Sequence, residues 1–184
     1  MKKLRSDIVQ FNRLRGDTRE MGTLRFVMAC FNPRIVPVVL LRLAELFHDK
    51  HLGVFAKLCS MLNVAIFGIE VSPKVKIAGG LFLPHTVGTV IGAASIGSNC
   101  TIMQGVTLGA VESDLSFTRV LRPVIGDEVL IGSGAKILGG ISVGDHARIG
   151  ANAVVLCDVP AYAVAVGVPA RIIIKNPLGE TNAD

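Results

Sequence analysis

The chain has 184 residues, of which 51% are hydrophobic and 18% charged, a composition typical of a globular protein. Its net charge of +5 comes from the first 25 residues, which hold seven Lys or Arg against three acidic residues, whereas the remainder holds twelve against eleven. With no Trp and one Tyr, it lacks the interleaved cations and stacking aromatics of a nucleic-acid-binding surface, so we expect no nucleic-acid partner.

The cysteines and the opening residues indicate the compartment. Cys30, Cys59, Cys100 and Cys157 are widely spaced with no CxxC pair, which predicts reduced thiols and argues against a zinc knuckle or a disulfide framework. The opening run MKKLRSDIVQFNRLRG places charges where a signal peptide needs an unbroken apolar stretch. A cytoplasmic location is therefore expected.

Residues 1–69 are predicted to be helical. Leu4, Ile8 and Phe11 mark one face of a short helix that ends near Gly16; a second helix begins at Pro37, and a third covers about 54–67. The apolar faces of these helices must be buried against another surface. The candidates are the next domain, other subunits, or a membrane surface such as the inner membrane face, which the basic N-terminal residues would approach. We favour packing within an oligomer.

A six-residue repeat dominates residues 70–172. Aliphatic residues open thirteen blocks, at Val71, Ile77, Leu83, Val90, Ile96, Ile102, Leu108, Ile125, Ile131, Ile137, Val143, Ile149 and Val155, with a one-residue slip before Val90. The fifth position is small or aliphatic in twelve of these blocks, and the second is often glycine, as in Ile96-Gly97 and Leu108-Gly109. Three such blocks form a triangular coil of eighteen residues, so the pattern predicts a mainly β protein built as a β-helix solenoid. The helical region precedes this solenoid, and a C-terminal tail at 173–184 follows it.

The repeat stops between Gly109 and Ile125. Residues 110–124 are polar and mixed in charge, which predicts a loop ejected from the solenoid. Loops on a rigid scaffold often carry binding groups, although a tolerated insertion is the alternative.

His85 is the candidate catalytic base. Of the four histidines, His48 and His51 form an HxxH on a helix without a third ligand, and His146 lies at a solenoid corner. His85 lies in LFLPHTVG at an outward position of its block. A neutral imidazole there can take a proton from an acceptor hydroxyl as that oxygen attacks a thioester.

The runs EVSPKVKIAGGLFLPHTVGTVIG, NCTIMQGVTLG, RPVIGDEVLIGSGAKILGGISVGDHARIGANAVVLCDVP and AVGVPARI resemble the catalytic domain of the serine O-acetyltransferases and of related exopolysaccharide and capsule acetyltransferases. The resemblance covers 70–172. It implies a left-handed parallel β-helix, a homotrimer, acetyl-CoA as donor in the groove between subunits, no metal, and His85 as general base.

The resemblance also implies further site residues. Glu70 stands where the family has the aspartate that orients the base. The family's cofactor contacts match Ala110, Ser133 and Ala151, where small residues allow the pantetheine arm to lie against the backbone. The candidate partners for the CoA phosphates are Arg148, Arg171 and Lys175.

Two departures bear on the acceptor. Serine acetyltransferases have Arg-His-Pro where this chain has Leu121-Arg122-Pro123, so the loop histidine is replaced by Arg122, and the helical region is shorter than is typical of the family. Both features favour a sugar hydroxyl as acceptor, with Arg122 as an acceptor-binding residue; serine O-acetylation is the alternative. A non-enzymatic scaffold and a zinc β-helix of the carbonic-anhydrase kind are further hypotheses, and the latter needs three converging histidines.

Overall fold

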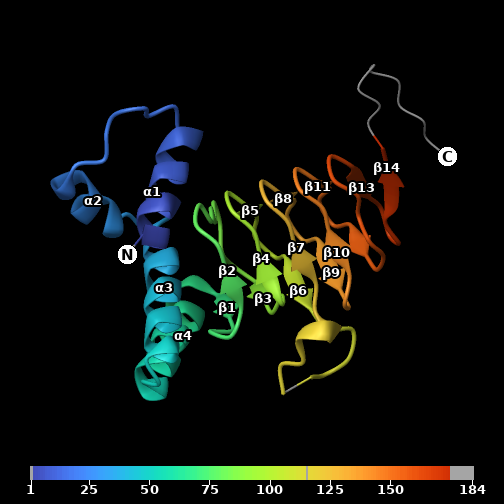
Figure 1. The fold of residues 1–184 in the computed structure, drawn as a ribbon, viewed down its shortest axis with the longest axis horizontal. Helices are drawn as coiled ribbons and strands as arrows, with labels where there is room; N and C mark the ends of the chain where they lie inside the picture. The colour runs from blue at the N-terminus through green and yellow to red at the C-terminus, as the bar shows by residue number, and fades with distance from the viewer. Residues whose placement is uncertain (1, 115, 175–184) are drawn as a thin grey trace.

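A computed structural model describes residues 2–114 and 116–174. Four helices precede a stack of short strands (Figure 1). The helices are α1 (Lys2–Leu14), α2 (Thr23–Cys30), α3 (Val36–Asp49) and α4 (Gly53–Phe67), and a 3-10 turn, η1 (Arg119–Leu121), lies in the ejected loop.

The strands form the three faces of a triangular prism. Sheet A contains β1 (Ile69–Val71), β3 (Thr89–Ile91), β6 (Thr107–Gly109), β9 (Lys136–Leu138) and β12 (Val154–Val155). Sheet B contains β2 (Lys76–Ile77), β4 (Ser95–Ile96), β7 (Val124–Ile125) and β10 (Ser142–Val143). Sheet C contains β5 (Thr101–Ile102), β8 (Leu130–Ile131), β11 (Arg148–Ile149), β13 (Val164–Val166) and β14 (Arg171–Ile173).

Successive coils pair in parallel, and β14 runs antiparallel to β13. Ile131 pairs with Ile149, eighteen residues further on, which confirms the predicted coil length. The expected left-handed parallel β-helix is therefore confirmed. Its strand β1 begins at Ile69.

The residues predicted to open the blocks are buried in twelve of the thirteen cases. The prediction is wrong at Val90, which is half-buried, while its neighbour Ile91 points inward and pairs with Val71 and Leu108. It is also wrong at Val87, the fifth position of the block that opens at Leu83, which is 73% exposed. Both errors have one cause: the turn between Leu83 and β3 is longer than the hexad allows, so the strand alternation restarts at Thr89 and Ile91.

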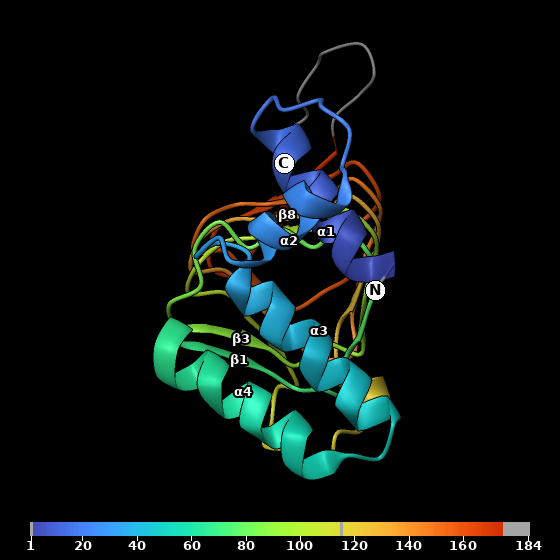
Figure 2. The same cartoon turned by 90° about the vertical axis from the view of Figure 1, so that its left-hand side faces the viewer.

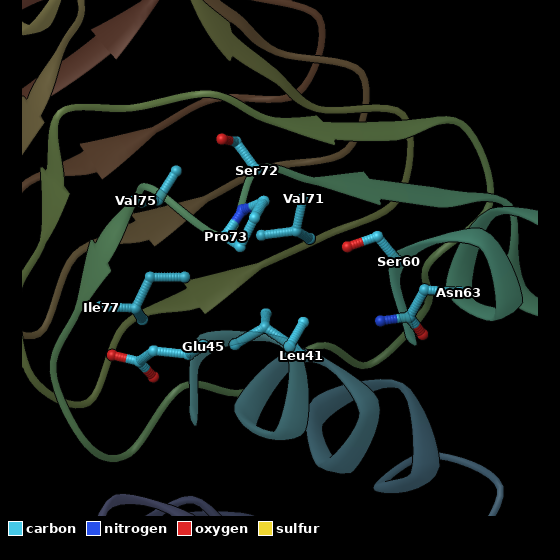
Figure 3. A pocket seen from close by; sticks show the side chains of 10 residues that line it. Leu41, Glu45, Ser60, Asn63, Val71, Ser72, Pro73, Val75 and Ile77 are labelled. Carbon is cyan, nitrogen blue, oxygen red and sulfur yellow. The ribbon is translucent and has the colours of Figure 1, made fainter. Parts of the chain in front are cut away.

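The helices cover the N-terminal end of the prism (Figures 1 and 2). Apolar residues of α1 and α3, among them Ile8, Phe11 and Leu41, join the same core as the first coil. Figure 3 shows Leu41 of α3 and Asn63 of α4 facing the turn after β1, around a hollow of only about 10 Å³. The expected cover for these helical faces is therefore, in part, the first coil itself.

Helices α2 and α4 are less well covered. No residue of α2 is buried, which explains why apolar periodicity did not predict it. Helix α4 buries only Ala56, Cys59 and Asn63. Its exposed apolar residues are Val54, Phe55, Leu58, Met61, Leu62, Val64 and Ile66. Contacts within one chain thus leave apolar surface of α4 uncovered.

Candidate active site

His85 lies on the edge of the prism between sheets C and A, in the connection from β2 to β3. The next residue, Thr86, donates its hydroxyl to the carbonyl of Phe67 at 2.8 Å, and the N–H of Gly88 donates to the carbonyl of Gly68 at 2.9 Å. Gly68 ends α4 in the left-handed conformation, with φ +63°. The turn is therefore fastened to the end of α4, while the His85 side chain is exposed.

Glu70 lies on the neighbouring strand β1, and its side chain points outward because Ile69 and Val71 on either side are buried. The Gly88–Gly68 hydrogen bond brings the two segments together, since Gly68 precedes Glu70 by two residues and Gly88 follows His85 by three. Among the described residues, no hydrogen bond joins Glu70 to His85. An orienting contact between the carboxylate and the imidazole stays a prediction.

Two of the predicted CoA contacts share the edge of His85, which we call the His85 edge. Its stacked turns are linked by backbone hydrogen bonds from Gly105 to Val87 and from Asn152 to Ser133. Ser133 and Ala151 lie in two of these turns, and both are small and at least partly exposed. The sequence-predicted base and these two positions therefore line one continuous edge.

The ejected loop lies on a different edge, between sheets A and B, which we call the loop edge. Ala110 begins the loop directly after β6, and it lines a hollow of about 400 Å³ together with Asp114, Leu121 and Gly139. A second groove, of about 500 Å³, separates the loop from the end of α3, with Lys74 and Arg119 among its lining residues. Neither hollow includes His85 among its lining residues.

Arg122 is nearly buried, with 10% of its side chain exposed, and it forms an ion pair of 3.0 Å with Asp114, whose side chain is 8% exposed. Asp114 was not predicted from the sequence, because the loop has no repeat to indicate which side chains turn inward. The opposite charges of Asp114 and Arg122 within one short loop were the available signal. The predicted contact of Arg122 with an acceptor is not tested by this geometry.

The predicted phosphate partners are spread over sheet C. Arg148 on β11 and Arg171 on β14 are both exposed, and Lys175 lies outside the described residues. Within 2–114 and 116–174, no group of three or more His, Cys, Asp or Glu could hold a metal ion. In the same part of the chain no helix is long and apolar enough to cross a membrane.

Comparison with known proteins identifies the family. Residues 122–157 match the family described as bacterial transferase hexapeptide (six repeats). A serine acetyltransferase of Helicobacter pylori is 44% identical over 145 residues, which are 78% of this chain and 83% of that protein. The chain belongs to the serine acetyltransferase family.

Solved structures of the family agree. A serine acetyltransferase in complex with CoA superposes with a TM-score of 0.78 at 31% identity, covering 93% of this chain and 68% of that one. A Neisseria gonorrhoeae serine acetyltransferase in complex with serine superposes with a TM-score of 0.75 at 28% identity, covering 92% and 67%. This member of the serine acetyltransferase family is therefore an acyltransferase that uses acetyl-CoA, as expected.

The expected kinship with exopolysaccharide acetyltransferases is not supported by these relatives. The argument from a short helical region also fails, because 145 aligned residues make up 83% of the Helicobacter pylori protein. A serine acetyltransferase of similarly small size therefore exists, so the length of the helical region does not separate the two acceptor classes.

Proposed function

We propose that the protein transfers the acetyl group of acetyl-CoA to the side-chain hydroxyl of L-serine. The observation that carries this proposal is the 44% identity to a serine acetyltransferase over most of both chains. The geometry supports it, because His85 is exposed on an edge whose turns offer small residues at Ser133 and Ala151. L-serine thus replaces, as the proposed acceptor, the sugar hydroxyl that was expected from the sequence.

His85 is proposed to act as general base and then as general acid. Its imidazole takes the hydroxyl proton of serine while the serine oxygen forms a bond to the thioester carbonyl carbon. The carbon–sulfur bond then breaks, and the imidazolium returns its proton to the departing thiolate. The products are O-acetylserine and CoA, and no oxidant or reductant is consumed.

A complete site is proposed to need a second copy of the chain. His85 and the ejected loop lie on different edges of one prism, so a site that uses both requires the His85 edge of one copy beside the loop edge of another. The exposed apolar residues of α4 support such an assembly, since contiguous apolar surface of this kind is typical of protein interfaces. A homotrimer, closed around a threefold axis, satisfies this requirement at three equivalent sites.

A sugar hydroxyl is the second candidate acceptor. The observation that favours it is the replacement of the family's loop histidine by Arg122. Against it stands the guanidinium of Arg122, which already donates hydrogen bonds to Gly92 of the coil and to Asp114 of its own loop.

A CoA-release assay tests the two acceptors directly. L-serine is compared with a panel of nucleotide sugars and glycans at fixed acetyl-CoA, using the full chain. Rapid CoA release that depends on L-serine is the expected result. Release that depends on a glycan, with no response to L-serine, would overturn the proposal in favour of the second candidate.

A further inference from the structure

Arg122 joins three parts of the protein through one guanidinium group. Nη1 donates to the carbonyl of Gly92 at 3.0 Å, which ties it to the neighbouring coil. Nη2 donates to the carbonyl of Asp114 at 2.7 Å and to its carboxylate at 3.0 Å, at the outgoing end of the loop. The ring of Phe117, at the far part of the loop, lies 4.2 Å from the guanidinium carbon.

A glycine of the coil, Gly92, lies directly beside the guanidinium of Arg122. A Cβ placed on Gly92 would lie 2.9 Å from Nη1 of Arg122 and 3.0 Å from the carbonyl oxygen of Leu108. Real Cβ atoms do not approach other atoms so closely, so a residue larger than glycine at position 92 would move the flexible end of the Arg122 side chain away from the coil. Glycine at position 92 therefore leaves room for the guanidinium to lie beside the coil.

Asp114 is held from the other side as well. Its carboxylate accepts hydrogen bonds from the Ser116 hydroxyl at 2.6 Å and from the backbone N–H of Thr118 at 2.5 Å. These bonds, with that of Ser116 the strongest, hold the pKa of Asp114 well below its usual range, so the carboxylate stays charged opposite Arg122. Asp114 therefore holds Ser116 and Thr118 of the loop in place, and Arg122 attaches the loop to Gly92 of the coil.

Arg122 has little capacity left for a ligand. Nη1 and Nη2 donate three hydrogen bonds between them, Nε is buried without a partner among the described atoms, and only 10% of the side chain is exposed. A guanidinium that recognises a substrate needs exposed donors in its planar fork. The sequence-based expectation of direct acceptor binding is therefore not what these contacts favour.

We infer that Arg122 is a positioning residue, which with Asp114 latches the ejected loop against the coil and so sets the shape of the hollow beside it. That hollow is lined by Ala110, Val111, Glu112, Ser113, Asp114, Leu121, Gly139 and Gly140. This pair joins the two ends of the loop, because Asp114 lies near its start and Arg122 lies near its end. The acceptor then meets the loop surface that the latch presents, not the guanidinium itself. The kinetic part of this inference rests on the proposed L-serine acceptor.

The test separates a latch from a direct contact by changing each partner in turn. Asp114→Asn removes the charge of the partner while leaving Arg122 in place, Arg122→Ala removes the guanidinium, and the double variant removes both. A latch predicts that each single variant raises the KM for the acceptor about 10- to 100-fold, since misplacing a positioning element costs this much. The double variant should be no worse than the poorer single variant. The KM for acetyl-CoA and the kcat should change much less.

Amide hydrogen exchange provides a readout that needs no acceptor. Exchange across residues 111–121 should accelerate about tenfold or more in both single variants, because the loop loses its attachment. Arg122→Lys is the milder variant, since an ammonium can still pair with Asp114 but cannot bridge to Gly92 at the same time, and it should give an intermediate result. Arg34→Ala, at an exposed arginine of the helical region, is the matched control and should match the unmodified protein.

Three outcomes overturn the inference. If Asp114→Asn keeps the wild-type KM while Arg122→Ala does not, Arg122 contacts the acceptor directly. If exchange of the loop is unchanged in both variants, the pair does not hold the loop. If the effects of the two single variants add fully in the double variant, the residues do not act as one unit. Failure of the serine proposal is seen separately, as absent serine-dependent CoA release in the unmodified protein.

Discussion

Arg42 of α3 and Asp7 of α1 form a buried ion pair with two hydrogen bonds, from Nε at 2.8 Å and from Nη2 at 3.0 Å. Their side chains are 7% and 0% exposed. Asp7 also accepts the N–H of Leu81 at 2.8 Å, and Arg42 donates to the carbonyls of Ile77 and Ala78. This pair therefore fastens two helices to the first coil of the β-helix, next to the segment that leads to His85.

Breaking this pair should destabilise the protein strongly. Arg42→Ala leaves the Asp7 carboxylate buried without its partner, which costs about 3–5 kcal/mol of unfolding free energy in comparable cases. Chemical denaturation of the two proteins measures the difference. Arg19→Ala is the matched control, because Arg19 pairs with Asp17 at the surface with 78% of its side chain exposed, and such changes stay within about 0.5 kcal/mol. Equal losses in the two variants would contradict the proposed role of the buried pair.

The pairing of Arg42 with Asp7 also shows where prediction from the sequence ends. The partner of Arg42 lies 35 residues earlier on another helix, and helical periodicity carries no information about such a contact. The hexads were predictable because each coil contacts only its neighbours, so a local period fixes the burial. Where the period is interrupted, at Val87 and Val90, the prediction of inward positions failed.

At the candidate site, too, positions set by the local repeat could be predicted and contacts outside the repeat could not. His85 was identified from its local sequence, and the structure places it with Ser133 and Ala151 on one edge, which follows from the repeat. The partnership of Asp114 with Arg122 was not identified, because a loop without a period gives no register for its side chains. Whether Glu70 orients His85 depends on side-chain positions that the strand pattern does not determine.

Two corner glycines should respond differently to the same substitution. In Gly97→Ala the added Cβ would lie 2.5 Å from the carbonyl carbon and oxygen of Gly126 in the next coil, so the backbone must shift. We expect a loss of about 1–3 kcal/mol, as for other overpacked sites. Gly109→Ala meets no atom within 4 Å, because the chain leaves the prism there, and should change stability by less than about 0.5 kcal/mol. Denaturant titrations that rank the two variants in the opposite order would refute the close-packing explanation.

Cys100 should make stability fall at alkaline pH. Burial raises the pKa of its thiol from 9.0 to about 11, so the folded protein holds this proton more tightly than the unfolded chain. The resulting stabilisation is complete below about pH 9 and is lost as the pH rises to about 11. Unfolding free energies at pH 8 and pH 10 should therefore differ more in the unmodified protein than in Cys100→Ala. An equal pH dependence in both proteins would show that Cys100 does not contribute.

Thiol labelling gives an independent view of the same residue. Cys157 is exposed and Cys100 is buried, so a thiol reagent at pH 8 should modify Cys157 quickly and Cys100 only after unfolding. Mass spectrometry of the labelled peptides identifies the sites. Labelling of Cys100 at the rate of Cys157 in the folded protein would contradict its burial beneath the corner.

Removing the imidazole of His85 should abolish most activity without affecting folding. His85→Ala is expected to lower the rate of acetyl transfer by about 10²- to 10⁴-fold, the usual contribution of a general base. Its melting temperature should stay close to that of the unmodified protein, because the side chain is exposed and the turn is held by Thr86 and Gly88 instead. His146→Ala is the matched control: its ring stacks on Tyr162 at 4.6 Å on the edge between sheets B and C, away from the candidate site, so turnover should be retained. Unchanged turnover in His85→Ala would remove this residue as the base and leave the reaction without an identified proton acceptor.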